Sequence, residues 1–206
     1  MAEYKAPDTS KNRWHAPEPY GYGPASASAL FIAAPLLTAA ALTLAGVVGG
    51  ADDEFQWPGP ILLLLVISAL ALVASIQLAY HARLYLYSYD DLACWLGPKH
   101  VEANALKLKA KQKKDQEVWT WYQLRAIHAF NAGTVLLGLG VAAALVPPGC
   151  GRQAGWRWTA AVVVLIATLV DAVWVTYMHM DALNKKRNWF YRSVHQLIEK
   201  TRRGRG

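Results

Sequence analysis

Four long apolar stretches constrain the fold of this 206-residue chain more than any other feature. They cover residues 29–49, 61–80, 126–146 and 158–177. Each stretch has about the twenty residues that an α-helix needs to cross a hydrocarbon core of roughly 30 Å. The composition, with 54% hydrophobic residues gathered in these blocks, agrees with burial in lipid. The sequence therefore predicts an all-α membrane protein with four transmembrane helices.

Positive charge is divided unequally among the segments that flank these stretches. Of the 21 Lys and Arg residues, three precede the first stretch, eight lie between the second and third, and eight follow the fourth. The two short connections hold only Arg152 and Arg157. Because cytoplasmic segments of membrane proteins are enriched in Lys and Arg, both termini and the central segment are predicted to be cytoplasmic. We expect a multi-pass protein of the plasma or inner membrane.

The predicted organisation has five parts. A polar tail with four prolines covers residues 1–24, and a first transmembrane hairpin covers residues 25–81. A cytoplasmic helical segment at 82–124 leads to a second transmembrane hairpin at 125–180, and an amphipathic basic helix with its tail occupies 181–206. The two hairpins both start from the cytoplasm and resemble parallel repeats, which argues against an inverted-repeat transporter. Chance similarity between any two apolar hairpins is an equal alternative.

Helix signals divide the central segment. Residues 90–96 are predicted to form a short helix that Ser88 or Tyr89 caps and that Gly97 and Pro98 end. From Lys99 a second helix is predicted to continue without a break into the third span. The tyrosines that follow the second span are expected to form an interfacial belt: Tyr80, Tyr85, Tyr87 and Tyr89.

Two sequence patterns inside the spans bear on helix packing. Pro35 removes one helical donor from the first span and is expected to kink it unless a neighbour satisfies the freed carbonyl. Small residues spaced for close helix approach occur in the second and third spans. This pattern predicts close packing either within one chain or between copies: Ala71, Ser75 and Ala79, and Ala129 with Gly133.

Polar residues of the spans gather near the predicted cytoplasmic end. Asp171 is an ionisable residue inside a span, where such a residue is normally paired or set in a wet cavity. It lies roughly 9 Å inside the boundary at Tyr177, and Asn131 reaches a similar depth. The favoured interpretation is a hydrogen bond from Asp171 to Asn131 or His128 that fixes helix packing. The alternative is a water-filled vestibule in which Asp171 binds a cation or proton. The same layer contains Gln77, His81 and His179.

The histidines and the absence of catalytic motifs bear on cofactors and enzymes. His81, His128 and His179 come from three helices at one depth, so bis-histidine haem ligation is geometrically allowed. The sequence has no HExxH or CxxC motif, and interfacial histidine is the favoured account. No nucleophile elbow, phosphate loop or paired-carboxylate motif occurs either. We expect no catalytic residue, metal or cofactor.

Basic residues in the cytoplasmic segments suggest partners for the chain. Anionic headgroups attract such residues by about 1 kcal/mol each, which favours lipid over nucleic acid as the target. The candidate contacts with lipid or a partner are Lys107, Lys109, Lys111, Lys113 and Lys114, and Lys185, Lys186 and Arg187.

The function predicted from these features is that of a non-enzymatic assembly or scaffold protein. Its bundle would contact anionic lipid and a cytoplasmic partner, and would assemble with further copies of itself. One alternative is a small oligomeric channel or a proton- or cation-coupled transporter that uses Asp171. A second alternative is a haem-binding electron carrier. Cys94 and Cys150 are predicted to lie on opposite sides of the bilayer, so they cannot form an intrachain disulfide.

Overall fold

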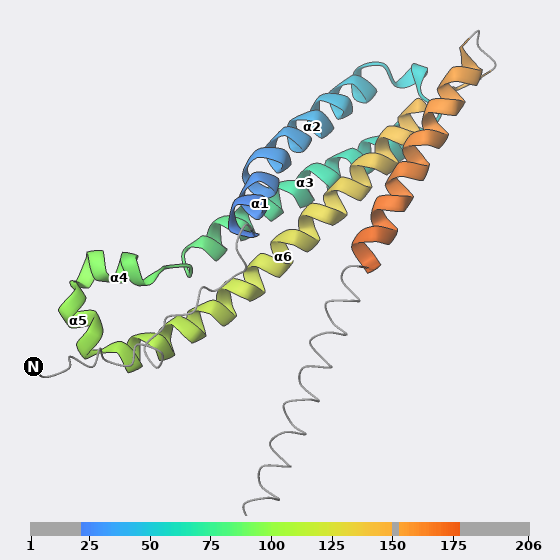
Figure 1. Cartoon of the computed structure of the whole chain (residues 1–206). Coiled ribbons are helices and arrows are strands. Elements are labelled where there is room, and N and C mark those ends of the chain that lie inside the picture. Colours follow the sequence, from blue (N-terminus) through green and yellow to red (C-terminus); the bar gives the residue numbers. More distant parts are fainter. Residues whose placement is uncertain (1–21, 150–152, 178–206) are drawn as a thin grey trace, which may run out of the picture.

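The computed structural model describes residues 22–149 and 153–177 (Figure 1). These residues form helices joined by short turns, and no strand occurs among them. The first elements are α1 (Tyr22–Ser28), the π-helical turn η2 (Ala29–Ala33), α2 (Ala34–Gly50) and the 3-10 turn η3 (Asp52–Glu54). They are followed by α3 (Pro58–Arg83), α4 (Tyr89–Leu96), α5 (Pro98–Ala103) and α6 (Ala105–Leu145). A further helix, Ala154–Tyr177, is called the fourth long helix below.

Four helices are long and apolar enough to cross a membrane. Their bounds are Pro24–Gly50, Pro58–Arg83, Ala105–Leu145 and Ala154–Tyr177. Each of them contains most or all of one apolar stretch recognised in the sequence. The all-α prediction is therefore confirmed for the part of the chain that the structure describes.

Helix α3 lies between α2 and α6 and has the largest share of buried residues among these helices. One buried cluster lies where α3 begins and consists of Val48, Ile61, Leu65 and Ala144. A second cluster lies near the other end of α3 and consists of Leu30, Ala79 and Ala126. The core thus follows the length of α3, with α2 and α6 covering it.

Glycines let α6 approach α3 closely. A Cβ atom added to Gly133 would lie 2.7 Å from Cγ of Leu72, and one added to Gly140 would lie 2.9 Å from Cδ2 of Leu65. At the same seam the hydroxyl of Ser68 donates a hydrogen bond of 2.7 Å to the carbonyl oxygen of Gly133. Gly133 therefore packs within one chain, which decides between the two arrangements that the sequence allowed for it.

The first long helix adapts to Pro35 by widening one turn. The backbone N–H of Ala34 bonds to the carbonyl of Ala29, five residues back, and η2 spans this region. Proline has no N–H to offer the carbonyl of Phe31, four residues before it. A π-helical turn is one of the recognised ways in which a helix accommodates such an interruption. The predicted disturbance at Pro35 thus takes the form of η2.

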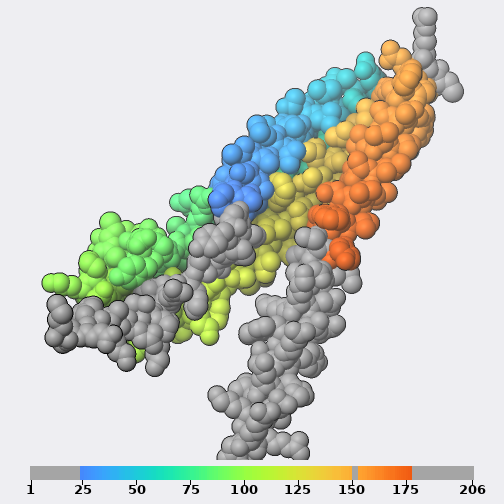
Figure 2. All heavy atoms as spheres, in the orientation of Figure 1, coloured from blue at the N-terminus to red at the C-terminus, as the bar shows by residue number. Residues whose placement is uncertain are grey.

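The fourth long helix lies beside α6 (Figures 1 and 2). Gly138 of α6 makes room for Thr168, since a Cβ atom at Gly138 would overlap the Thr168 side chain. Arg157, near the start of the fourth long helix, donates hydrogen bonds of 3.3 Å each to the carbonyls of Leu145 and Ala144. These two carbonyls belong to the last turn of α6, where no backbone N–H remains to bond them. Arg157 therefore ties the two helices together at that end.

Helices α4 and α5 lie away from the bundle, where α4 packs on α5 and α5 contacts α6 (Figure 1). We call residues 84–118 the arm. Ser88 caps α4: its hydroxyl accepts a hydrogen bond from the backbone N–H of Asp91, and the Asp91 carboxylate accepts one from the backbone N–H of Ser88. Gly97, with φ of +82°, ends the helix. The short helix, its cap and its stop are confirmed as predicted.

The predicted uninterrupted helix from Lys99 is wrong at one position. Asn104 leaves helical geometry, with φ of −110° and ψ of 16°, so α5 ends at Ala103 and α6 begins at Ala105. The side-chain amide of Asn104 donates a hydrogen bond of 3.1 Å to the carbonyl of His100. An Asn side chain that bonds nearby backbone competes with helix continuation, which accounts for the break.

Candidate functional site

The arm has a small core and a polar tie to α6. Val101 is fully buried, and Leu92 is buried in α4. The hydroxyl of Tyr87 donates a hydrogen bond of 2.7 Å to the Asp115 carboxylate on α6. The side-chain amide of Gln112 donates one of 3.2 Å to the carbonyl of Tyr87. These contacts hold the segment that follows α3 against α6, so the arm is a folded unit.

The hydrogen bond between Tyr87 and Asp115 requires a protonated tyrosine hydroxyl. Burial is the largest of three causes that raise the pKa of Tyr87 to about 12, and the hydrogen bond to Asp115 and the negative charge of Asp115 are the other two. The Tyr87 hydroxyl therefore keeps its proton and remains a donor at physiological pH. At the α4 cap, the backbone and side-chain hydrogen bonds from Ser88 lower the pKa of Asp91, so that carboxylate stays ionised.

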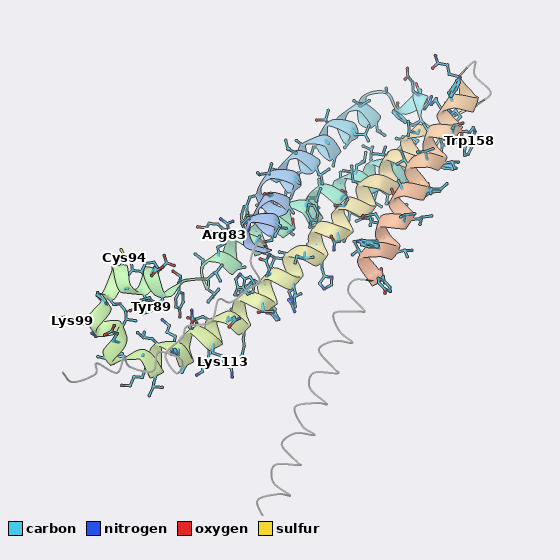
Figure 3. All side chains as sticks on the ribbon, in the orientation of Figure 1. Arg83, Tyr89, Cys94, Lys99, Lys113 and Trp158 are labelled. Carbon is cyan, nitrogen blue, oxygen red and sulfur yellow. The ribbon has the colours of Figure 1, made fainter. Side chains whose placement is uncertain are left out.

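The outer surface of the arm combines positive charge with large apolar side chains. Trp95 is 68% exposed and Leu106 is 87% exposed, and Leu96 is also exposed. The lysines predicted to make contacts belong to the same arm; four are exposed, while Lys109 is half-buried and has a bonding partner. Figure 3 shows Cys94, Lys99 and Lys113 on the arm, at the end of the molecule opposite Trp158.

Aromatic rings gather where the arm joins the bundle. Tyr122 of α6 stacks on His81 and on Tyr85, with ring centroids 6.0 Å apart in both pairs, and meets Trp121 edge to face at 4.8 Å. The guanidinium carbon of Arg125 lies 3.5 Å from the Trp121 ring centroid. We call these five residues, together with Tyr80, the aromatic belt. It contains two of the four tyrosines expected there, while Tyr87 serves the arm instead.

The polar residues predicted to form one cluster are only partly brought together. Gln77 and His81 are neighbours on α3, with Nδ1 of His81 2.9 Å from the Gln77 carbonyl oxygen. Asp171 is exposed on the fourth long helix, and Asn131 is half-buried on α6. Within residues 22–149 and 153–177, no hydrogen bond joins Asp171 to Asn131 or to His128. That hydrogen bond therefore stays a prediction.

Several predicted sites lie outside the described residues. They are the polar tail up to residue 21, Cys150, His179, and the basic residues Lys185, Lys186 and Arg187 with their amphipathic helix. Among the residues that the structure describes, no group of three or more His, Cys, Asp or Glu side chains is placed to hold a metal ion.

A cleft that the sequence did not indicate opens beside the aromatic belt. It has a volume of about 290 Å³ and lies between the first long helix, the end of α3 and the middle of α6. Its polar lining side chains include Arg83 and the 6%-exposed Gln123. The guanidinium carbon of Arg83 lies 4.3 Å from the Phe31 ring centroid. The other lining residues are Ser26, Ala27, Leu30, Ala79, Leu86 and Trp119.

No protein-family model, curated protein sequence or solved structure matches this chain. Its function is therefore inferred from the geometry of the chain itself: a folded basic arm, a belt of aromatic rings, and an apolar bundle of four long helices.

Proposed function

We propose that this chain is a non-enzymatic, multi-pass protein of the plasma or inner membrane that works as a scaffold or accessory component of an assembly. The four long helices cross the bilayer as two hairpins related as parallel repeats. Both termini and the arm lie in the cytoplasm, in keeping with the charge distribution. The arm binds a cytoplasmic protein partner, and anionic lipid contacts the chain at the bilayer surface.

The observation that carries this proposal is the length and continuity of α6. It has 41 residues in one helix, which corresponds to about 62 Å of length, twice the roughly 30 Å of a hydrocarbon core. Since its apolar half fills the bilayer, its basic half projects into water. The folded arm that it carries is then a platform held away from the membrane.

Distance along α6 favours a protein partner over lipid for the arm lysines. At helical rise, Lys114 lies about 18 Å and Lys107 about 28 Å from Ala126, where the apolar stretch begins. Headgroups extend only about 5–7 Å beyond the hydrocarbon core, and salt screens charges over about 8 Å. A tilt of about 20° shortens these distances too little to change the conclusion. Lipid contact therefore falls to basic residues nearer the belt.

The surface chemistry of the arm defines its partner. Lysines around the helix steer an acidic surface toward it. Trp95 and Leu106 offer exposed apolar anchors, and buried tryptophans commonly carry much of the energy of a protein interface. The partner is accordingly a cytoplasmic protein with an acidic surface around an apolar pocket.

The fourth long helix supports self-assembly in the membrane. Val170, Val173 and Trp174 are exposed on it, and so is Asp171. A carboxylate facing hydrocarbon is costly, and a neighbouring helix relieves that cost by offering it a polar partner. A second copy of the chain packed on this helix is therefore part of the proposal.

Thiol labelling tests the topology, because the chain carries one cysteine on each predicted side. Cys94 is exposed on the arm. In sealed cells, a membrane-impermeant maleimide should label the Cys94→Ser variant at Cys150. It should label the Cys150→Ser variant at Cys94 only after permeabilisation. Labelling of both variants from the same side would contradict the proposal.

Photo-crosslinking tests the partner. A photoreactive residue in place of Trp95 should yield an adduct of one defined mass with a cytoplasmic protein. The triple reversal of Lys107, Lys111 and Lys113 to Glu should abolish the adduct. Reversal of Lys185, Lys186 and Arg187 to Glu makes the same change in charge and should leave the adduct in place. Absence of any adduct in the parent, or equal loss in both variants, would refute a partner site on the arm.

A further inference from the structure

The cleft beside the aromatic belt contains a positive charge with no protein counter-charge among the described residues. Arg83 lies at the end of α3, beside α1 (Figure 3). Its guanidinium stacks on the Phe31 ring at 4.3 Å, and within the described residues it makes no hydrogen bond or ion pair. Stacking on a ring face leaves the N–H groups at the guanidinium edge available. The Arg83 donors can therefore bind an anion in the cleft.

A buried amide in the same cleft is also available to a ligand. Gln123 is only 6% exposed, and no hydrogen bond to its side chain occurs in the part of the chain that the structure describes. No fully buried side-chain nitrogen or oxygen among the described residues lacks a hydrogen-bond partner, so the unbonded amide of Gln123 is accessible from the cleft that it lines. It can offer two N–H donors to a ligand there.

Most of the remaining lining of the cleft is apolar. Leu30 and Phe31 come from the π-helical turn η2, Ala79 from α3, and Leu86 from the segment after it. Turns of this kind are rare and recur at functional sites. The cleft thus joins a cationic, donor-rich part to a hydrocarbon surface, which matches an amphiphile with an anionic head.

We propose that this cleft binds the phosphate group of an anionic phospholipid. Arg83 receives the phosphate through its planar fork, and the Gln123 amide donates to a phosphate oxygen. The glycerol and first acyl carbons lie on Leu30 and Leu86. The volume of about 290 Å³ is at the lower limit of ordinary ligand pockets, so it holds the headgroup while the chains remain in the bilayer. The site depends on the membrane insertion proposed above, because only then is it at headgroup level.

Native mass spectrometry of the full chain in detergent tests this site. With phosphatidylglycerol as the probe, one lipid should bind saturably, and phosphatidylcholine should bind more weakly. Arg83→Gln and Gln123→Leu should each weaken phosphatidylglycerol binding, by about ten- to hundredfold for the charged side chain. Arg125→Gln is the matched control, because Arg125 belongs to the belt but does not line the cleft. It should leave the saturable binding of one lipid unchanged, because any contact of Arg125 with surrounding headgroups is separate from the cleft.

Arg83→Lys separates geometry from charge and is expected to bind with intermediate affinity, since lysine keeps the charge but lacks the fork. Photo-crosslinking of the unmodified chain with a photoreactive phosphatidylglycerol tests the site without any substitution. The crosslinks should fall in the peptides that contain Phe31 or Gln123.

Three outcomes would overturn the proposal: full binding by Arg83→Gln, equal loss in Arg125→Gln, or photolabelling confined to other helices. Glycerol phosphate, which has the same phosphate chemistry without acyl chains, should not compete. Competition at the same concentration would assign the site to a soluble phosphate and refute the lipid. Thiol labelling that confirms the topology while lipid selectivity is absent would refute only this inference and leave the scaffold proposal standing.

Discussion

Helix α3 and the fourth long helix are both apolar enough to cross a membrane, yet they are used very differently. In the most apolar window of α3, 33% of the residues are buried, whereas in that of the fourth long helix only 11% are. Helix α3 offers small and hydroxyl residues to its neighbours, and Ser68 and Ser75 are both fully buried. The fourth long helix turns Val, Ile and Trp outward. Hydropathy thus identifies a span, while the distribution of small residues determines which span becomes the centre of the bundle.

The largest effect is expected where α3 meets α6. Gly133→Val should place a branched side chain against Leu72 and the Ser68 carbonyl, and should lower the free energy of unfolding by about 3 kcal/mol through overpacking. Unfolding in mixed detergent micelles measures this. Gly46, where an added Cβ atom would meet nothing within 4 Å, is the control. Gly46→Val should change the stability by less than about 0.5 kcal/mol. Similar losses in the two variants would remove the basis for calling α3 central.

The link between the fourth long helix and α6 should show the next largest effect. Arg157→Leu removes both hydrogen bonds to the last turn of α6 and should cost about 2 kcal/mol, the range for hydrogen bonds from charged groups. The same unfolding experiment applies. Arg157→Lys retains the charge and should restore part of the loss. Unchanged stability in Arg157→Leu would mean that the helix is held by apolar packing alone.

A smaller effect should distinguish hydrogen bonds between helices from those within one. Ser68→Ala removes the bond to Gly133 across the α3–α6 seam and should cost about 0.6 kcal/mol, an average for such bonds in membrane bundles. Thr168→Val removes a bond of 2.8 Å to Val164 within the fourth long helix. The latter should have almost no effect, as judged by the unfolding free energies of the two variants. The reverse order would contradict the contrast between the two helices.

A substitution at Asp171 tests whether the fourth long helix takes part in ion conduction. Asp171→Asn should leave the stability of the monomer nearly unchanged, because the carboxylate makes no hydrogen bond within the described residues. In reconstituted vesicles we expect no ion flux with either the parent or the variant. Flux in the parent that Asp171→Asn abolishes and Asp53→Asn preserves would instead favour the channel alternative. A Soret band in the purified protein would favour the haem alternative.

The arm is a third region, held by few contacts, and its tie to α6 should respond to high pH. Because the pKa of Tyr87 is raised in the folded arm, the stabilisation from its hydrogen bond is fully present below pH 10.0 and is lost as the pH rises through about 12. A fluorophore on Cys94, in a Cys150→Ser background, should lose anisotropy over this interval. Tyr87→Phe cannot ionise at this position and should show no such step. A step of equal size in Tyr87→Phe would assign the transition to another group.

The sequence predicted well where most helices lie, but it did not predict which side of each helix faces its neighbours. The four long apolar helices follow from runs of apolar residues, and the ends of α4 follow from the local chemistry of Ser88 and Gly97, so both were predicted correctly. The break at Asn104 was missed because the surrounding residues all favour helix. Depth in a span is readable from residue number, but rotation about the helix axis is not. The numbers of Asp171 and Asn131 predict a similar depth for both, but they do not say whether the two side chains face each other.

The cleft was unpredictable for a related reason. Arg83, Phe31 and Gln123 are far apart in the chain and meet only through tertiary packing. Two signals could have pointed to it: Pro35, which displaces the turn that carries Phe31, and a glutamine among the aromatic residues at the start of the third span.

The unbroken backbone of α6 has a mechanical consequence. In the membrane arrangement proposed above, α6 has no hinge between its apolar half in lipid and its basic half in water, so the helix would move as a lever that pivots at the bilayer surface. A change in tilt of about 10° would carry Lys107 sideways by roughly 5 Å at the distance set by helical rise. Membrane helices accommodate thicker or thinner surrounding lipid by tilting. Such a change in lipid thickness would therefore displace the Lys107 end of α6 far enough to alter its contacts with a bound partner.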